Sequence, residues 1–157
     1  MMQDEHFMRE ALTLAQEAAD EGEVPVGAVV VRDGKIIGRG RNRREIGKNA
    51  LAHAEIEAID MACRTLGGWR LSGCDLYVTL EPCPMCAGAI INARIDRVIQ
   101  GSADPKAGSC GSVVDLFSLP YNHRPVLVCG VLEQECSDIL RDFFRSLRCK
   151  RKENETV

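Results

Sequence analysis

Two spacings of apolar residues alternate along this sequence of 157 residues. Stretches with an apolar residue every three or four positions indicate amphipathic helices, and the short continuous apolar runs between them indicate buried strands. We expect helices over 4–21, 53–66, 84–94 and 133–149, and strands within VGAVVVRDGKIIGRG, DLYVTL, RVIQG and PVLVCGVL. Strands that alternate with helices predict an α/β fold, in which helices cover both faces of one sheet.

The first apolar strand run contains Asp33-Gly34, a dipeptide that accepts the positive φ angles of a tight turn. This turn predicts an antiparallel hairpin, so the sheet is expected to be mixed rather than purely parallel. Asp4 stands where its side chain would cap the first helix. A long loop over 102–124 holds most of the turn residues between the last two strands.

The length of the chain is typical of one domain, which we expect to span residues 1–150. Apolar residues make up 45% of the sequence and charged residues 27%, an ordinary balance for a globular protein. The final segment, CKRKENETV, has charges of alternating sign and no recognisable pattern. Residues 151–157 are therefore expected to form a mobile tail.

The start of the chain, MMQDEHFMRE, has no apolar stretch behind a basic one, so no secretory signal is visible. The longest apolar runs, such as VGAVVV, are far too short to span a bilayer. We therefore expect a cytoplasmic protein that does not act at a membrane. Cysteines stay reduced in that compartment, so the eight cysteines suggest metal binding or catalysis rather than disulfides.

Charge is distributed unevenly, although a net charge of −3 and a pI near 5.7 argue against a general nucleic-acid binder. Each of two basic clusters is either a solvated face or a surface that contacts phosphate groups. The first cluster holds Lys35, Arg39, Arg41, Arg43, Arg44 and Lys48, and the second holds Arg141, Arg145, Arg148, Lys150, Arg151 and Lys152.

The segment TLEPCPMCAGAI carries a Cys-x-x-C pair, which alone is compatible with a redox site, a structural zinc site or a catalytic zinc site. The segment HAE begins an earlier helix and supplies a histidine, so His53, Cys83 and Cys86 form a set of three zinc ligands. The two cysteines are three positions apart at a helix start, where the helix dipole favours thiolates and Pro84 loses no hydrogen bond.

Three protein ligands favour a catalytic zinc, because such a site keeps water in the fourth position and lowers its pKa. A closed structural site would need a fourth ligand from His6, His123 or another cysteine, and nothing in the sequence places one nearby. The remaining thiols are expected to be small buried or incidental residues. They are Cys63, Cys74, Cys110, Cys129, Cys136 and Cys149.

A water that attacks an aromatic ring carbon bearing an amino group needs a group that moves protons. Glu55 is the candidate, because it lies two residues from His53 at the same helix end, and burial should raise its pKa into a useful range. Glu81 competes for this role. We favour a structural role for Glu81, in which it caps the following helix or orients a neighbour.

His-x-Glu followed by Pro-Cys-x-x-Cys resembles the signature of the zinc-dependent cytidine/deoxycytidylate deaminase superfamily. Between Phe7 and Arg148, the segments VPVGAVVV, GRNRRE, DPKAGSCGS, NHRP and DFFRSLR are similar to the family of bacterial tRNA-specific adenosine deaminases. The resemblance implies a three-layer α/β/α sandwich around a mixed five-stranded sheet. It also implies a homodimer with one zinc ion per chain that converts the wobble adenosine of a tRNA anticodon stem-loop to inosine.

Carried over to this sequence, the resemblance makes His53, Cys83 and Cys86 the zinc ligands and Glu55 the proton shuttle. It implies that Asn42 hydrogen-bonds the flipped adenine, for which an amide offers both a donor and an acceptor. Pro25, Val26 and Gly27 would form part of the pocket wall. The residues that would meet the anticodon loop are Asp104, Lys106, Asn122, His123, Phe144 and Arg145.

Phe143 and Phe144 have a helical spacing that fits core packing equally well, so one is expected in the core and the other near the RNA-facing surface. Two other functions stay open at this point. A deaminase of a free nucleobase or nucleoside, such as cytosine, guanine or a pterin-like ring, would keep the zinc site but need no basic clusters. A non-enzymatic zinc module would need neither Glu55 nor an open coordination position.

Overall fold

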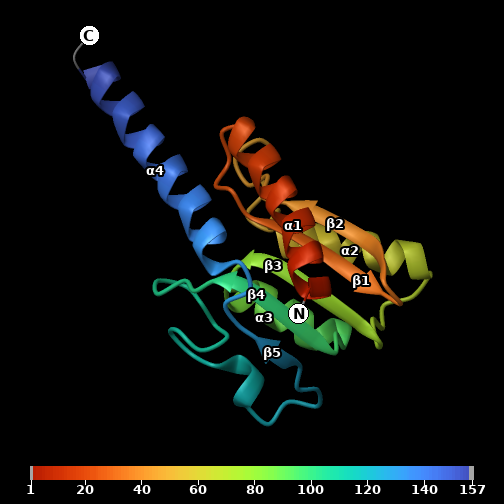
Figure 1. Cartoon of the computed structure of the whole chain (residues 1–157). Coiled ribbons are helices and arrows are strands. Elements are labelled where there is room, and N and C mark those ends of the chain that lie inside the picture. Colours follow the sequence, from red (N-terminus) through yellow and green to blue (C-terminus); the bar gives the residue numbers. More distant parts are fainter. Residues whose placement is uncertain (1, 156–157) are drawn as a thin grey trace.

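The computed structural model describes residues 2–155, and its centre is one mixed sheet of five strands (Figure 1). The strand order is β2-β1-β3-β4-β5. β1 is antiparallel to both of its neighbours, whereas β3, β4 and β5 run parallel to one another. The strands are β1 (Gly27–Arg32), β2 (Lys35–Arg41), β3 (Cys74–Leu80), β4 (Arg97–Ser102) and β5 (Val126–Val128).

Helices cover both faces of the sheet, which confirms the predicted three-layer α/β/α sandwich. One face packs against α1 (Met2–Asp20) and the start of α4 (Glu133–Glu155), and this core includes Met8, Tyr77 and Cys136. The other face packs against α2 (Ala54–Leu66) and α3 (Pro84–Ala93), with a second core around Leu76 and Val98. In Figure 1, α1 lies in front of the sheet and α2 lies behind it.

The Asp33-Gly34 turn is formed as predicted, with φ angles of 50° and 75°. It joins β1 and β2 into an antiparallel hairpin that has one irregularity in register between Val30 and Val31. β1 is antiparallel to β2 and β3. Its first residues therefore lie beside the last residues of β2, β3 and β4, along the edge of the sheet that is formed by strand ends. This edge carries the candidate functional site.

Two glycines let α2 lie directly on β2. A side chain at Gly38 or Gly40 would overlap the backbone carbonyls of Ala58 and Ala54, respectively. Side chains of α2 also satisfy the outer edge of β2, because Met61 Sδ accepts from Arg39 N and Glu57 Oε2 accepts from Arg41 N. Covering an edge strand in this way blocks pairing with other chains, and it fixes where α2 begins.

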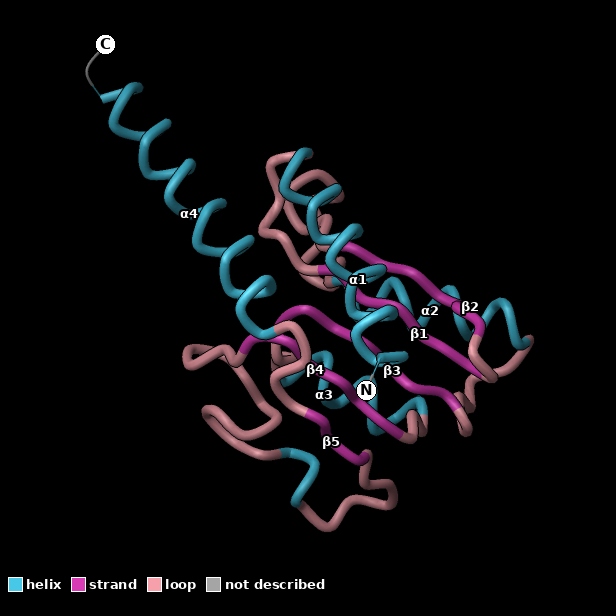
Figure 2. Tube along the Cα trace, in the orientation of Figure 1, coloured by secondary structure: helices cyan, strands magenta, loops and turns pink. Residues whose placement is uncertain are grey.

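Some expected details differ from the structure. Asp4 lies inside α1, and its carboxylate accepts hydrogen bonds from Tyr77 and Arg97 instead of capping the helix. β5 is shorter than the PVLVCGVL run, because Gly130 and Leu132 adopt positive φ angles that turn the chain into α4. The long loop before β5 contains a single 3-10 turn, η1 (Leu116–Ser118), as Figure 2 shows.

The helix α4 continues to Glu155, past its expected end near residue 149. Five residues of the segment expected as a mobile tail are thus helical, and its last two residues lie outside the described part of the chain. The mobility of the tail stays a prediction. Within residues 2–155, no helix is both long and apolar enough to cross a membrane.

Candidate metal centre and active site

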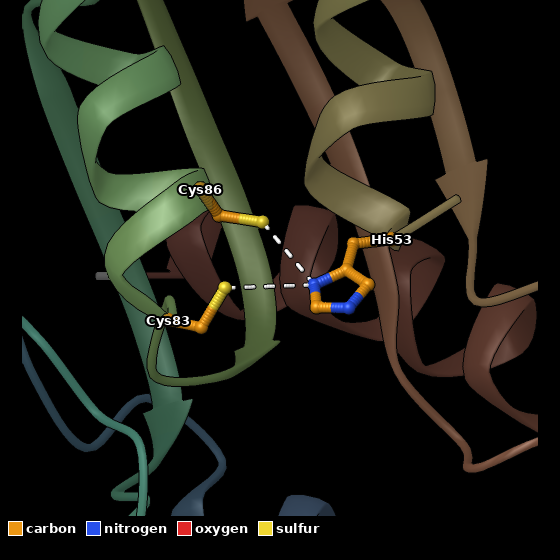
Figure 3. Close-up of side chains that lie close together, drawn as sticks. All are labelled: His53, Cys83 and Cys86. Carbon is orange, nitrogen blue, oxygen red and sulfur yellow. Dashed lines mark hydrogen bonds between the residues drawn. The ribbon is translucent and has the colours of Figure 1, made fainter. Parts of the chain in front are cut away.

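Two helix starts bring the predicted metal ligands together. His53 is the N-cap residue of α2, and Cys83 is the N-cap residue of α3 with Pro84 in the first helical turn. Cys86 follows one turn later and is fully buried. Figure 3 shows the His53 imidazole, at the start of α2, pointing toward both thiols, which come from the start of α3.

The spacing of the three ligand atoms fits a zinc ion. His53 Nδ1 lies 3.6 Å from Cys83 Sγ and 3.5 Å from Cys86 Sγ. A tetrahedral centre with ordinary zinc–nitrogen and zinc–sulfur bond lengths would separate these atoms by about 3.6 Å. Among residues 2–155, the only group of three or more His, Cys, Asp or Glu side chains whose ligand atoms lie within 4.8 Å of one another holds these three residues. The arrangement could therefore bind a metal and leave one coordination position to a non-protein ligand.

The two thiols affect each other's ionisation. A hydrogen bond from Cys86 lowers the pKa of Cys83 to about 4, and the same bond raises the pKa of Cys86. The hydrogen bond with Cys83 also raises the pKa of His53. One thiolate is thus formed readily and the second proton is held tightly, so metal binding has to displace the proton of Cys86.

A cavity of about 200 Å³ opens beside this group. It is smaller than the roughly 300–1,000 Å³ of pockets that enclose drug-sized ligands, so it fits a single base ring better than a whole nucleotide. The Glu55 side chain lines it and is buried, and burial raises the pKa of Glu55 to about 7, as expected from the sequence. A carboxyl group with this pKa can both accept and donate a proton near neutral pH.

The predicted wall and base-binding residues divide into two groups. Asn42 and Val26 line the cavity, whereas Pro25 and Gly27 are absent from its lining. Gly27 packs against α1, where a side chain would overlap the carbonyl of Ala11. The Asn42 amide donates to Val24 O and accepts from Arg44 N, so its orientation is fixed before any ligand binds.

The predicted RNA-contacting residues lie in three places. Asp104 lines the cavity, and Lys106 is exposed two residues away, with its backbone N–H donating to Asp104 Oδ1. His123 contacts the carbonyl of Ile95, just before β4, and its neighbour Asn122 is exposed. Because the cavity lies beyond the ends of β3 and β4, Asn122 and His123 are at the opposite edge of the sheet in a single chain. This placement also rules out His123 as a fourth metal ligand.

Phe144 and Arg145 are exposed on α4, which extends away from the sheet past the edge where β4 ends (Figure 1). The expectation that one of the two phenylalanines is in the core is wrong, because α4 buries only Cys136 among its described residues. Phe143 is half-buried and lines a groove between α1 and α4. The helix diverges from the sheet after its first turns, a path that helical periodicity does not reveal.

The basic clusters are partly neutralised by acidic neighbours. Arg41 pairs with Glu17 and Glu21 of α1, and Arg43 pairs with Glu57 of α2. On α4, Arg141 and Arg145 pair with aspartates one turn earlier, at Asp138 and Asp142. Arg44 differs, because it lines the cavity beside His53.

Sequence reasoning assigned Arg44 only to a basic cluster and not to the pocket, and it missed the wall residues Val24, Leu80 and Ala107. Arg44 could have been found, because it stands two positions after Asn42 in GRNRRE. The six cysteines outside the site are free, and Cys74, Cys110 and Cys136 are buried, as expected of small buried thiols.

Comparison with known proteins agrees with this geometry. The family model of the MafB19-like deaminases matches residues 2–148. A tRNA-specific adenosine deaminase of Bacillus subtilis (strain 168) is 51% identical over 153 residues, which cover 97% of this chain and 95% of the relative. This chain belongs to the tRNA-specific adenosine deaminase family, within the MafB19-like deaminases.

Solved structures of family members and other deaminases share the fold. A structure from studies of A-to-I editing by tRNA:A34 deaminases at the wobble position has a TM-score of 0.84 and 51% identity, covering 86% of this chain and 99% of that one. A guanine deaminase from Bacillus subtilis has a TM-score of 0.62 and 37% identity, covering 92% of each chain. The sandwich thus supports deamination of different rings, and the substrate has to be argued from the site.

Proposed function

We propose that this protein is a zinc-dependent hydrolase that deaminates the wobble adenosine of a tRNA anticodon loop to inosine. The observation that carries the proposal is one cavity that joins a buried carboxyl group of pKa about 7 to a three-ligand metal group and an oriented amide. The 51% identity to a tRNA-specific adenosine deaminase over almost the whole chain supports the choice of substrate.

Two thiolates and a neutral imidazole suit zinc, which we propose binds once per chain through His53, Cys83 and Cys86. When bound, the ion would supply a water molecule that is nucleophilic at neutral pH. The protein's own part in the reaction is proton transfer and orientation. Glu55 takes one proton from the attacking water and delivers it to ring nitrogen N1. It then takes the proton of the new hydroxyl group on C6 and delivers it to the amine, so that the C6–N bond breaks, ammonia leaves and C6 keeps the oxygen as a carbonyl.

The Asn42 amide is held by Val24 and Arg44 at the cavity wall, which supports a role in orienting the base. One donor hydrogen of the amide is left for an adenine edge. Arg44 adds a positive charge beside the cavity, where the phosphate next to an extruded nucleotide would lie. A base in an anticodon loop is partly unstacked already, which lowers the cost of extruding it.

The surrounding surface supports an RNA substrate over a free base. Asp104 lines the cavity, Lys106 is exposed two residues further along the chain, and α4 carries Phe144 and Arg145 on an exposed extension beside the same edge. Asn122 and His123 lie at the other edge, so their contact with RNA requires a second chain. A homodimer is therefore part of the proposal, as is action in the cytoplasm.

The second candidate, deamination of a free base, is favoured by the shared fold of the guanine deaminase. A synthetic anticodon stem-loop with adenosine at the wobble position distinguishes the two functions. We expect that hairpin to be converted to the inosine form, and the same strand annealed into a duplex to react poorly. Conversion of free guanine or cytosine, with the stem-loop unchanged, would support the second candidate.

A further inference from the structure

Two buried glutamates outside the metal group hold the two loops that form the rim of the cavity. Residues 42–52, here called the first rim loop, contribute Asn42 and Arg44 to the cavity lining and end before His53, the N-cap residue of α2. Residues 103–112, the second rim loop, contribute Asp104 and Ala107. Glu23 is 1% exposed and contacts the first rim loop, and Glu81 is 3% exposed and contacts the second.

Glu81 gathers the second rim loop around its carboxylate. Oε1 accepts hydrogen bonds from Asp104 N at 3.1 Å and from Ser112 Oγ. Oε2 accepts from Cys110 N at 3.0 Å and Ser112 N at 3.1 Å. Gly108 passes so close that a side chain there would overlap the carboxylate of Glu81. Both ends of the loop therefore depend on one buried anion.

Glu23 plays the same part for the first rim loop. Its Oε1 accepts from Glu45 N at 3.0 Å, and its Oε2 accepts from Glu45 N at 3.1 Å and Ile46 N at 3.3 Å. These amides directly follow Arg44. The residue after Glu23, Val24, accepts a hydrogen bond from the Asn42 amide through its backbone carbonyl.

The carboxylates of Glu23 and Glu81 differ from the carboxyl group of Glu55 in what their oxygens contact. All four oxygens of Glu23 and Glu81 accept from loop backbones or Ser112, so both carboxylates are engaged by the loops, although Glu81 also lines the cavity. A buried carboxylate is stable only when such donors surround it. The same donors keep each loop in one conformation, which lowers the conformational entropy that a ligand has to remove on binding.

We propose that Glu23 and Glu81 are positioning residues for the RNA substrate, each of which holds one rim loop ready before the anticodon loop arrives. This inference rests on the proposed function. It assigns the glutamates to substrate binding and leaves the metal group and Glu55 unaffected. Loosening either loop therefore raises KM for the stem-loop more than it lowers kcat.

The test compares Glu23→Gln and Glu81→Gln with the wild-type protein. Glutamine keeps the shape but replaces one acceptor oxygen with a donor, so some loop amides lose their partner. We expect KM for the stem-loop to rise about tenfold in each variant, the effect of losing one charge-assisted hydrogen bond, with kcat within about threefold of wild type. Zinc content should stay unchanged, because no metal ligand is altered.

Hydrogen exchange of backbone amides supplies a readout that needs no turnover. Glu81→Gln should speed exchange at Asp104, Cys110 and Ser112 but not at Glu45 and Ile46, and Glu23→Gln should do the reverse. Each variant is thus the control for the other. Ser112→Ala replaces Glu81→Gln in the test if that variant does not fold. It removes one side-chain donor from Glu81 while leaving the charge buried, so it should raise KM by a smaller factor.

Asp4→Asn is the control for general loss of stability. Asp4 accepts hydrogen bonds from Tyr77 and Arg97 on the α1 face of the sheet, away from the cavity, so its loss should lower stability and leave KM unchanged. Wild-type KM in both glutamine variants, or an equal rise in Asp4→Asn, would overturn the positioning role. Failure of the proposed function itself would be seen differently, as a wild-type protein that leaves the stem-loop unconverted.

Discussion

The Glu55 carboxyl group has fewer donors around it than that of Glu81, because only its own backbone N–H and the Cys86 thiol lower its pKa through hydrogen bonds, whereas Asp104, Cys110 and Ser112 surround Glu81. Burial therefore dominates and raises its pKa to about 7, whereas the hydrogen bonds to Glu81 outweigh burial and hold the pKa of that group below its ordinary value. Two glutamates near one site are thus given different tasks by their surroundings. One can exchange a proton near neutral pH, and the other stays charged and holds a loop.

Replacing Glu55 with Gln tests the task of proton transfer. The amide keeps the shape but cannot move protons, so we predict a fall in kcat of about a thousandfold or more. Zinc content, measured by metal analysis, should remain one ion per chain. Loss of the metal together with Glu55 would mean that the carboxylate is a ligand and that the proposed role is wrong.

At the scale of elements, much could be predicted because the signals are local. The Asp33-Gly34 turn, the helix start at Pro84 and the Cys-x-x-C pair depend on residues close in sequence, and each is found where expected. The partners of Glu81 lie 23 to 31 residues away in the chain, in a loop without periodicity, so they could not be predicted. Glu23 stands in an acidic stretch where nothing in the sequence distinguishes it from Glu21.

The close packing of α2 on β2 gives a prediction at this scale. Gly40→Ala would bring a methyl group into the carbonyl of Ala54, and we expect a loss of about 3 kcal/mol in the free energy of unfolding. Gly88→Ala in α3 is the matched control, because apart from the adjacent residues and the backbone of its own helix no atom lies within 4 Å of the added methyl group. Gly88→Ala should raise the free energy of unfolding by about 0.5–1 kcal/mol, because alanine has a higher helix propensity than glycine. Denaturant unfolding of both variants measures the two effects, and an undiminished free energy in Gly40→Ala would contradict the close approach.

The second rim loop should respond to acid. The folded-state pKa of Glu81 is lowered, so its contribution to stability is present above the unfolded pKa and is lost as pH falls through the folded value. Protection of the Cys110 and Ser112 amides from hydrogen exchange should therefore stay constant from pH 7 to about 5 and decrease below about 4. In Glu81→Gln this decrease should be absent. An equal decrease in protection in Glu81→Gln would mean that another group causes the sensitivity to acid.

At the scale of the whole molecule, the chain combines a net charge of −3 with an exposed basic helix end. Ion pairs within the chain neutralise part of each basic cluster, so focusing of positive charge depends on the arginines that remain available on α4 and beside the cavity. The exposure of α4 could not be predicted, because its apolar periodicity is the same for a helix that packs along its whole length. The position of the proposed RNA-facing surface therefore depends on how the whole chain folds.

Binding of RNA by this surface should depend strongly on salt. We predict that affinity for the stem-loop falls steeply as ionic strength rises, and that replacing Arg145 and Arg148 with Ala weakens affinity more than it slows the saturated reaction. Arg64→Ala is the control, because Arg64 pairs with Asp60 within α2. A flat salt titration would mean that phosphate contacts do not carry the binding.

The most direct measurement is to incubate the purified protein with total tRNA from its source organism and to sequence the cDNA, in which inosine is read as guanosine. The proposed function predicts that adenosine at the wobble position is read as guanosine after incubation, and that Glu55→Gln leaves every tRNA unchanged. Unmodified tRNA together with deamination of free cytosine or guanine would contradict it, and so would full conversion by the Glu55→Gln protein.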